Sequence, residues 1–215
     1  MKPEKNITIS VLLAVYNTEF SLVKRAIDSV LNQNFQPFEL IVIDDGSDKI
    51  LQDELVKYVK IHEDKIIYVR HKNCGQSKSI NRGIKNCLGE YIAIIDADDE
   101  YKPNHLSACL NEMKNADLIS SYTETIVDKS EDYYVPDKFD PHKRVHVDDC
   151  ILFATLFGRK EVFTEFKFRN TYAADSIFYD TVALHYRVKK ANLKTYIYYR
   201  NIPNSICEQM KRKNA

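Results

Sequence analysis

Two hydrophobic patterns alternate along the first 121 residues. Short apolar runs rich in β-branched residues indicate buried strands, and the stretches between them carry apolar residues every three or four positions, which indicates amphipathic helices. This order predicts an α/β domain with a Rossmann-like, mostly parallel central sheet and helices on both of its faces. The expected strands are 7–15, 39–43, 65–69, 91–95 and 117–121, and the expected helices are 19–31, 51–60, one ending at 87, and 103–113.

Turn and cap residues place the ends of these elements. Thr18 is a good N-cap for the first helix, and Ser47 can cap the second. Gly46 allows the positive φ of a tight turn, and Gly89 is the expected stop of the third helix. Pro103 suits the first turn of the fourth.

The alternation stops in the second half of the chain. Residues 124–149 are polar and charged, and so long a segment inside a domain is functional, as a lid or an acceptor-side insert, or else disordered. After it we expect a strand at 150–157, a helix at 174–191 and a last strand at 195–199.

Composition narrows the function classes. The chain has 215 residues, 44% of them hydrophobic, and its 31 basic residues balance its 31 acidic ones, so no global field points to nucleic acid. No apolar run approaches a membrane span, and the start of the chain, Met1 to Asn6, has no signal-peptide core. The five cysteines are widely spaced without a CxxC pair, so we expect reduced thiols that fill space in a cytoplasmic protein.

Three carboxylates follow the apolar run at 91–95. Asp96, Asp98 and Asp99 would repel one another at the end of a buried strand unless a cation lay between them. Oxygen-rich clusters suit hard divalent ions such as Mg²⁺ or Mn²⁺. In open α/β sheets ligands bind beyond the carboxyl ends of the strands, so the cluster predicts a metal with an anionic ligand at this edge.

The usual phosphate-binding motifs are absent. The chain has five glycines and neither GxGxxG nor GxxxxGK[ST]. An EF-hand is excluded because Tyr101 and Ser107 stand where the loop needs glycine and glutamate. A DxD pair is also found in aspartyl-phosphate phosphatases, but there it follows the first strand, so a metal-dependent phosphotransferase is the weaker alternative.

A second acidic pair, Asp44-Asp45, ends the strand at 39–43. Neighbouring parallel strands end on one edge of a sheet, so both acidic turns would face one crevice. Taken alone, the pair is explained by the good turn chemistry of Asp-Asp-Gly-Ser, and the alternative is a carboxylate that accepts a nucleobase N–H.

Four segments together resemble family 2 glycosyltransferases of the GT-A fold. They are Val11-Leu12-Leu13-Ala14-Val15-Tyr16-Asn17, Val42-Ile43-Asp44-Asp45-Gly46-Ser47, Asn73-x-Gly75-x-Ser77-x-x-x-Asn81-x-Gly83 and Gly89-Glu90-Tyr91-Ile92-x-x-x-Asp96-x-Asp98-Asp99. The resemblance implies one GT-A domain over 1–215, with a nucleotide-sugar-binding half at about 1–122 and an acceptor-binding half at about 123–215. It also implies a nucleotide-sugar donor, with uracil as the expected base, a divalent metal (Mn or Mg), and inversion at the anomeric carbon.

The resemblance also assigns roles to residues of this chain. Tyr16 and Glu19 would line the nucleotide cleft, Asp45 would bind the base and Asp44 would support its turn. Asp98 and Asp99 would be the metal neighbours. The full set expected around the donor is Ala14, Tyr16, Glu19, Asp44, Asp45, Asn73, Asn81, Asp96, Ala97 and Asp98.

The second half supplies the candidate base. The family places an acidic residue near a helix start here, and Asp175 occupies the matching place, although Ala174 replaces the usual Glu. The alternatives are that Asp175 only caps the helix, or that Asp180 is the base. Near the C-terminus the family's metal-contacting His is replaced by Asn201, and Arg200 would meet phosphate or be a solvated surface charge.

The hypothesis is therefore a metal-dependent inverting glycosyltransferase of glycan or polysaccharide synthesis. Its acceptor would be a hydroxyl of a glycan, a lipid-linked molecule or a protein, and nucleic acid is not an expected partner. Tyr alternates with Lys and Arg in 186–200, which suits peripheral contact with the inner face of a membrane as well as a solvated face. A nucleotide-sugar-binding protein that has lost turnover is the alternative.

Overall fold

The computed structural model describes residues 7–138, 140 and 142–200. The elements in the first half are β1 (Ile9–Val15), α1 (Phe20–Leu31), β2 (Phe38–Asp44), α2 (Lys49–Ile61), β3 (Ile66–Arg70), α3 (Gln76–Ile84), β4 (Tyr91–Asp96), β5 (Glu100–Tyr101) and α4 (His105–Glu112). Those in the second half are β6 (Leu118–Ile126), β7 (Tyr134–Pro136), β8 (Arg144–His146), β9 (Leu156–Arg159), α5 (Lys160–Glu165), α6 (Ala174–Val182) and β10 (Val188–Tyr199), with short 3₁₀ turns at Ser130–Tyr133, Val147–Asp149 and Phe153–Thr155.

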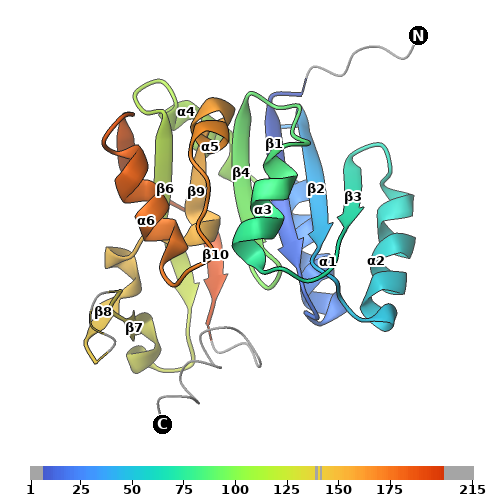
Figure 1. Ribbon diagram of the computed structural model, residues 1–215, viewed down its shortest axis with the longest axis horizontal. Helices are drawn as coiled ribbons and strands as arrows, with labels where there is room; N and C mark the ends of the chain where they lie inside the picture. Colours follow the sequence, from blue (N-terminus) through green and yellow to red (C-terminus); the bar gives the residue numbers. More distant parts are fainter. Residues whose placement is uncertain (1–6, 139, 141, 201–215) are drawn as a thin grey trace.

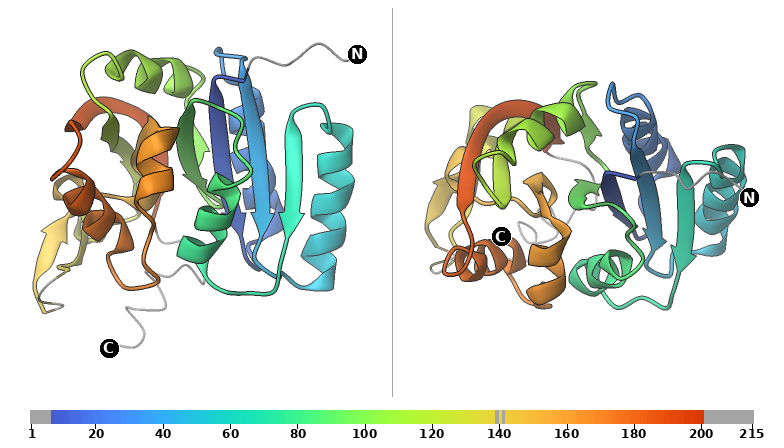
Figure 2. Two further views of the ribbon diagram at one scale, coloured as in Figure 1. Left: turned by 45° about the horizontal axis from the view of Figure 1, so that its top comes forward. Right: turned by 90° about the horizontal axis from the view of Figure 1, so that it is seen from above.

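One mixed sheet organises the described residues. Its strand order is β3-β2-β1-β4-β9-β6-β10-β5, and the first four strands are parallel. In Figures 1 and 2, α3 and α5 lie on one face of the sheet and α1 and α4 on the other. The expected α/β architecture, mostly parallel and covered on both faces, is confirmed.

The apolar runs form strands because they can be buried from both sides. Every residue of β2 is buried, and Val11, Leu12 and Leu13 of β1 are fully inaccessible. The helices contribute the apolar stripes read from the sequence, such as Val23, Ala26, Ile27 and Val30 of α1. The two halves therefore share one continuous core.

The antiparallel strands depart from the predicted alternation. β9 lies between β4 and β6 and runs antiparallel to both, and β5 runs antiparallel to β10. The strand expected at 150–157 is therefore only Leu156–Arg159, preceded by a 3₁₀ turn. Hydrophobic periodicity reports burial but not strand direction, so this insertion was not predictable.

The helix expected at 174–191 is wrong in its second half. α6 ends at Val182, and Leu184, which belongs to the predicted apolar stripe, is 79% exposed. Val188–Ala191 pair instead with β6, as the start of the long strand β10 that curves through the second half in Figure 2. Pairing with an available strand overrides the local helical pattern.

Several predicted caps also differ. The N-cap of α1 is Glu19 rather than Thr18, and Asp48 rather than Ser47 caps α2 by accepting the Leu51 amide. α3 ends at Ile84, well before Gly89, where a Cβ would lie 2.6 Å from the Ser10 nitrogen, so this glycine allows a close approach of two backbones.

Residues 124–149 are ordered where the structure describes them. β6 extends to Ile126, and β7 and β8 form a small antiparallel sheet below α6 in Figure 1. Within the described part of the chain, the helices are all too short or too polar to cross a bilayer.

Candidate active site

The two acidic turns meet at one edge of the sheet. β2 and β4 both flank β1, and the register places Asp44 beside Val15 and Asp96 beside Ala14. Because adjacent strands are about 4.8 Å apart, the two acidic strand ends lie roughly 10 Å apart across β1. A ligand of that length could touch both turns at once.

The turn after β4 is tied to β10 through Asp99. This carboxylate is almost fully buried and accepts hydrogen bonds from the Tyr196 hydroxyl (2.6 Å) and the Tyr199 amide (2.8 Å). The Tyr196 hydroxyl also accepts the Asp96 amide at 3.2 Å. Both oxygens of Asp99 are thus occupied by the fold, which leaves Asp96 and Asp98 as the carboxylates of the turn that retain some exposure.

Asp96 lies among other negative charges. Burial, with the charges of Asp98 and Asp175, raises its pKa to about 7, although a hydrogen bond from the Gln76 amide (2.7 Å) opposes the rise. Burial also raises the pKa of Asp98. A divalent cation between these carboxylates would relieve their repulsion, and oxygen ligands suit Mg²⁺ or Mn²⁺.

Asp175, in the second half of the chain, lies near enough to Asp96 for its charge to act on that carboxylate. It lies in the first turn of α6 and accepts the backbone amides of Ser176 and Phe153, while burial raises its pKa. The N-cap position belongs to Ala173, so Asp175 is not the N-cap, although it accepts an amide of the first turn. The alternative base, Asp180, is 61% exposed and pairs with Lys138.

Asp44 supports the turn after β2. Its carboxylate is completely buried and accepts the Ser47 amide (2.7 Å), the Tyr68 hydroxyl (2.6 Å) and Arg70 Nε (3.0 Å). Burial alone would raise its pKa, but the hydrogen bonds from Tyr68 and Ser47 outweigh burial and lower it. Asp44 therefore remains charged and holds the turn in shape.

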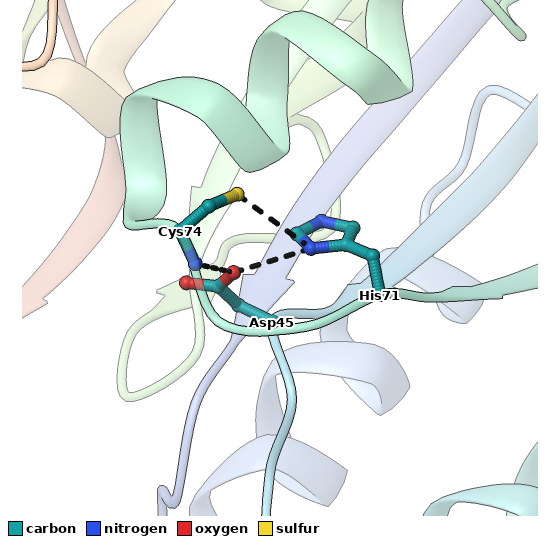
Figure 3. A group of neighbouring side chains, drawn as sticks. All are labelled: Asp45, His71 and Cys74. Carbon is teal, nitrogen blue, oxygen red and sulfur yellow. Dashed lines mark hydrogen bonds and ion pairs between the residues drawn. The ribbon is translucent and has the colours of Figure 1, made fainter.

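Asp45 holds the loop that leads into α3 (Figure 3). Its carboxylate accepts the backbone amides of Cys74 and Gly75, each at 2.8 Å, and the Asn73 side chain at 3.2 Å. His71 Nδ1 lies 3.3 Å from the same group. Asp45 thus fixes the loop between β3 and α3 against the turn after β2.

The remaining expected residues divide into two groups. Tyr16 and Glu19 are exposed beyond the end of β1, and Ala14 and Ala97 are small residues beside the acidic turn. Asn81, in contrast, uses its amide to clamp the Phe168 backbone, donating at 2.8 Å and accepting at 3.1 Å. Its side chain joins α3 to the second half of the chain.

Sequence reasoning missed several residues that support the acidic turn. Gln76 bonds Asp96, and Arg25 of α1 donates to the Asp98 carbonyl while its guanidinium lies 3.9 Å from the centre of the Tyr199 ring. Tyr196 and Tyr199 complete the set. These residues are far apart in sequence and form no motif, so a single sequence carries no signal for them.

Arg200 is neither solvated nor in the acidic turn. It is buried and donates to the Asp132 carbonyl and the Tyr198 hydroxyl, so the prediction of a solvated surface charge is wrong. Asn201, the start of the chain and Cys207, which is one of the five cysteines expected to be reduced, lie outside the residues that the structure describes.

Comparison with known proteins identifies the fold. The chain aligns with the complex of S. aureus TarS residues 1–349 with UDP-GlcNAc at a TM-score of 0.71 and 19% identity, covering 92% of this chain and 60% of that one. It aligns with the mannosyltransferase PcManGT from Pyrobaculum calidifontis, in complex with GDP-Man and Mn²⁺, at 0.73 and 16% identity, covering 99% and 62%. Both are GT-A glycosyltransferases, which confirms the expected GT-A fold.

The proteins related in sequence are also named glycosyltransferases. An uncharacterized glycosyltransferase of Rickettsia prowazekii is 30% identical over 175 residues, which is 73% of this chain and 54% of the relative. One of Rickettsia bellii is 40% identical over 115 residues, 54% of this chain and 16% of the relative. The chain therefore spans about half or less of the length of these relatives.

The sequence model described as "Glycosyl transferase family 2" matches residues 10–184, which include both acidic turns and Asp175. The chain belongs to glycosyl transferase family 2.

Proposed function

We propose that the chain is a metal-dependent inverting glycosyltransferase. It would transfer a sugar from a nucleoside-diphosphate donor to a hydroxyl acceptor. The observation that carries this proposal is the meeting of Asp96 and Asp98 with Asp175, a carboxylate nearly 80 residues later in the chain, whose charge helps to raise the pKa of Asp96.

The donor would span the two acidic turns. The separation of roughly 10 Å across β1 suits a nucleoside diphosphate with its base at the β2 turn and its phosphates at the β4 turn. Structures with the same fold contain UDP-GlcNAc or GDP-Man, which supports a nucleotide-sugar donor without selecting the base. The choice of UDP rests on the resemblance, and Asp45 would both face the base and shape the loop beside it.

The residues of the β4 turn fit a divalent cation. Asp96 and Asp98 would hold Mn²⁺ or Mg²⁺, and Asp99, whose oxygens are bonded to β10, would position them rather than bind the ion itself. When bound, such an ion supplies Lewis-acid stabilisation of the charge that develops on the departing diphosphate.

Asp175 would act as the general base. The acceptor oxygen attacks the anomeric carbon as the bond between that carbon and the diphosphate breaks, and the acceptor proton passes to Asp175. Attack on the face opposite the leaving group inverts the configuration. Burial raises the pKa of Asp175, and a stronger base accepts this proton more readily.

The two halves of the chain would bind different substrates. Residues 1–122 would bind the donor, and residues 123–215, with the small β7–β8 sheet beside α6, would bind a glycan, lipid-linked or protein hydroxyl in the cytoplasm. The small sheet is the nearest match to the predicted lid.

A thermal-shift panel of nucleotides and nucleotide sugars, with and without Mn²⁺, tests this proposal. A bound donor raises the melting temperature by mass action, and we expect the rise to need Mn²⁺. Asp98→Asn should remove most of the Mn²⁺-dependent rise, whereas Asp53→Asn, in an exposed pair with Lys49 on α2, should leave it unchanged. A panel in which no nucleotide responds with Mn²⁺ present would contradict the proposal.

One observation favours an alternative, a donor-binding protein without turnover. Ala174 stands beside Asp175 where the family usually has Glu. An assay of nucleotide release distinguishes the two, because the alternative predicts donor binding with neither hydrolysis nor transfer. A phosphotransferase would instead turn over a phosphate ester without a sugar nucleotide, and Asp96→Asn would abolish its phospho-enzyme.

A further inference from the structure

Three side chains with different ligand atoms meet beside the β2 turn (Figure 3). Asp45 comes from the turn itself, and His71 and Cys74 come from the loop between β3 and α3. A carboxylate oxygen, an imidazole nitrogen and the thiol sulfur all lie within 4.8 Å of one another. The carboxylates of the β4 turn lie on the other side of β1.

The distances match those of a tetrahedral zinc centre. Zinc binds nitrogen at about 2.0 Å, oxygen at about 2.1 Å and sulfur at about 2.3 Å, which gives tetrahedral N···O and N···S edges of about 3.4 and 3.6 Å. In this chain His71 Nδ1 lies 3.3 Å from Asp45 Oδ1 and 3.6 Å from Cys74 Sγ. Two edges of the polyhedron are therefore already formed.

The imidazole is surrounded in a way that suits a cation. Nδ1 faces the Asp45 carboxylate, the Cys74 sulfur and the Lys72 carbonyl, which lies 3.0 Å away. These groups accept hydrogen bonds, so they hold a proton on Nδ1, and a metal ion would replace that proton. Nε2 is buried and has no hydrogen-bond partner among the described residues, so no contact at Nε2 prevents the proton from moving there when a metal ion binds Nδ1.

The exposure and the charge of the three side chains are also compatible with a bound divalent ion. The side chains of His71 and Asp45 are only 8% and 4% exposed, whereas Cys74 is half-buried and offers a route for the ion. Binding would release the thiol proton and move the imidazole proton from Nδ1 to Nε2, so the imidazole stays neutral and the carboxylate and thiolate together neutralise a divalent ion. A nitrogen, a sulfur and one oxygen form a ligand set for zinc rather than for Mg²⁺ or Mn²⁺.

We propose that Asp45, His71 and Cys74 form a binding site for a borderline-soft divalent cation of the zinc class, distinct from the Asp96–Asp98 pair. The protein supplies three ligands, and water completes the fourth position. The ion links the end of β2 to the loop that begins α3, so it stabilises that loop. The site does not depend on sugar transfer, and with the ion bound Asp45 would shape the base end of the donor site through the loop and not accept a base N–H itself.

Cobalt titration of the full chain under reducing, metal-free conditions tests the site. Co²⁺ replaces Zn²⁺ and reports a cysteine ligand by thiolate-to-cobalt charge-transfer absorption. We expect one equivalent to produce this band and Zn²⁺ to displace it. Cys74→Ser should abolish the band, and His71→Gln should weaken Co²⁺ binding at least tenfold. Cys150→Ser, a change at another half-buried cysteine, and Asp98→Asn should retain it.

The control variants separate this proposal from the proposed function. Loss of the band in Asp98→Asn, its persistence in Cys74→Ser, or no band in the parent chain would overturn the inference. The melting temperature in EDTA shows whether each variant folds, and if Cys74→Ser does not fold, His71→Gln decides the matter. The readout needs neither a nucleotide nor turnover, so a failed activity assay leaves it intact.

Discussion

The same side chain type plays opposite roles at this edge of the sheet. Asp44 is buried among donors, which lower its pKa, whereas burial, together with the charges of other carboxylates, raises the pKa of Asp96 to about 7. The first arrangement stabilises a turn at all ordinary pH values. In the second arrangement the carboxylates repel one another until a cation or a proton binds, and perturbed carboxylates of this kind are typical of functional sites.

Removal of the candidate base should separate binding from transfer. Asp175→Asn keeps the shape of the side chain but cannot accept the acceptor proton, so we expect transfer to fall about 100- to 10,000-fold. Donor binding, measured by thermal shift with Mn²⁺, should remain near that of the parent. Asp180→Asn lies on the same helix and should lose only an exposed ion pair with Lys138. Transfer at the parental rate in Asp175→Asn would remove this residue from the mechanism.

Removal of a crowded charge should stabilise the metal-free chain. Asp96→Asn removes a charge that is disfavoured by burial and by repulsion from Asp98 and Asp175, so in EDTA at about pH 8, where Asp96 is charged, we expect the free energy of unfolding to rise on the order of 1–3 kcal/mol. The rise in melting temperature that Mn²⁺ produces in the parent should shrink in the variant. Denaturant unfolding with and without Mn²⁺ measures both effects. A variant less stable than the parent in EDTA would contradict the repulsion argument.

At the scale of elements, β10 organises the acidic turn. It is the last strand in the described chain, yet it pairs with β6 along its length and with β5 at its end. Tyr196 and Tyr199 reach from it to Asp99. The register shift between Ala191 and Tyr196 is the irregularity that separates the first part of β10, which pairs with β6, from the part beside the turn, which pairs with both β6 and β5.

One hydroxyl of this strand should matter to both stability and metal response. Tyr196→Phe removes the donor to Asp99 and the acceptor for the Asp96 amide in a fully buried place. We expect a loss of about 1–3 kcal/mol in stability and a smaller thermal response to Mn²⁺. Tyr198→Phe, whose hydroxyl bonds Arg200, should leave the Mn²⁺ response unchanged. An equal response to Mn²⁺ in both variants would show that the hydroxyl does not position the turn.

At the scale of the molecule, the second half is joined to the first through β9. This strand pairs with β4 on one side and β6 on the other, so the half that carries Asp175 cannot move independently of the half that carries Asp96. Asp117 reinforces the junction by accepting from Arg159 at the end of β9 and from Arg187 before β10. These ion pairs lower the pKa of Asp117 to about 2.

This junction predicts a pH dependence of stability. The pKa of Asp117 lies below its ordinary value of 3.8, so its stabilisation is complete above about pH 4 and is lost as the pH falls towards 2. Asp117→Asn should cost on the order of 1 kcal/mol at pH 6, because the Arg187 side chain is 62% exposed and water screens the pair. Denaturant unfolding should show this difference shrinking below pH 4, and a constant difference from pH 6 to pH 3 would refute the argument.

The sequence by itself determined the strands β1 to β4, the helices between them and both acidic turns. These features are local. Apolar runs form buried strands, acidic residues mark the ends of those strands, and Gly46 adopts its positive φ of 81° where a turn requires it. The resemblance added the candidate residue Asp175, although no local pattern of this chain connects it with Asp96.

The tertiary structure alone decided the rest. The antiparallel insertion of β9, the strand that replaces the second half of the last predicted helix, and the donors to Asp99 all depend on contacts between segments far apart in sequence. The same holds for the approach of Asp45, His71 and Cys74. Burial patterns record that a residue is covered but not by which neighbour, so partners of this kind appear only when the chain is folded.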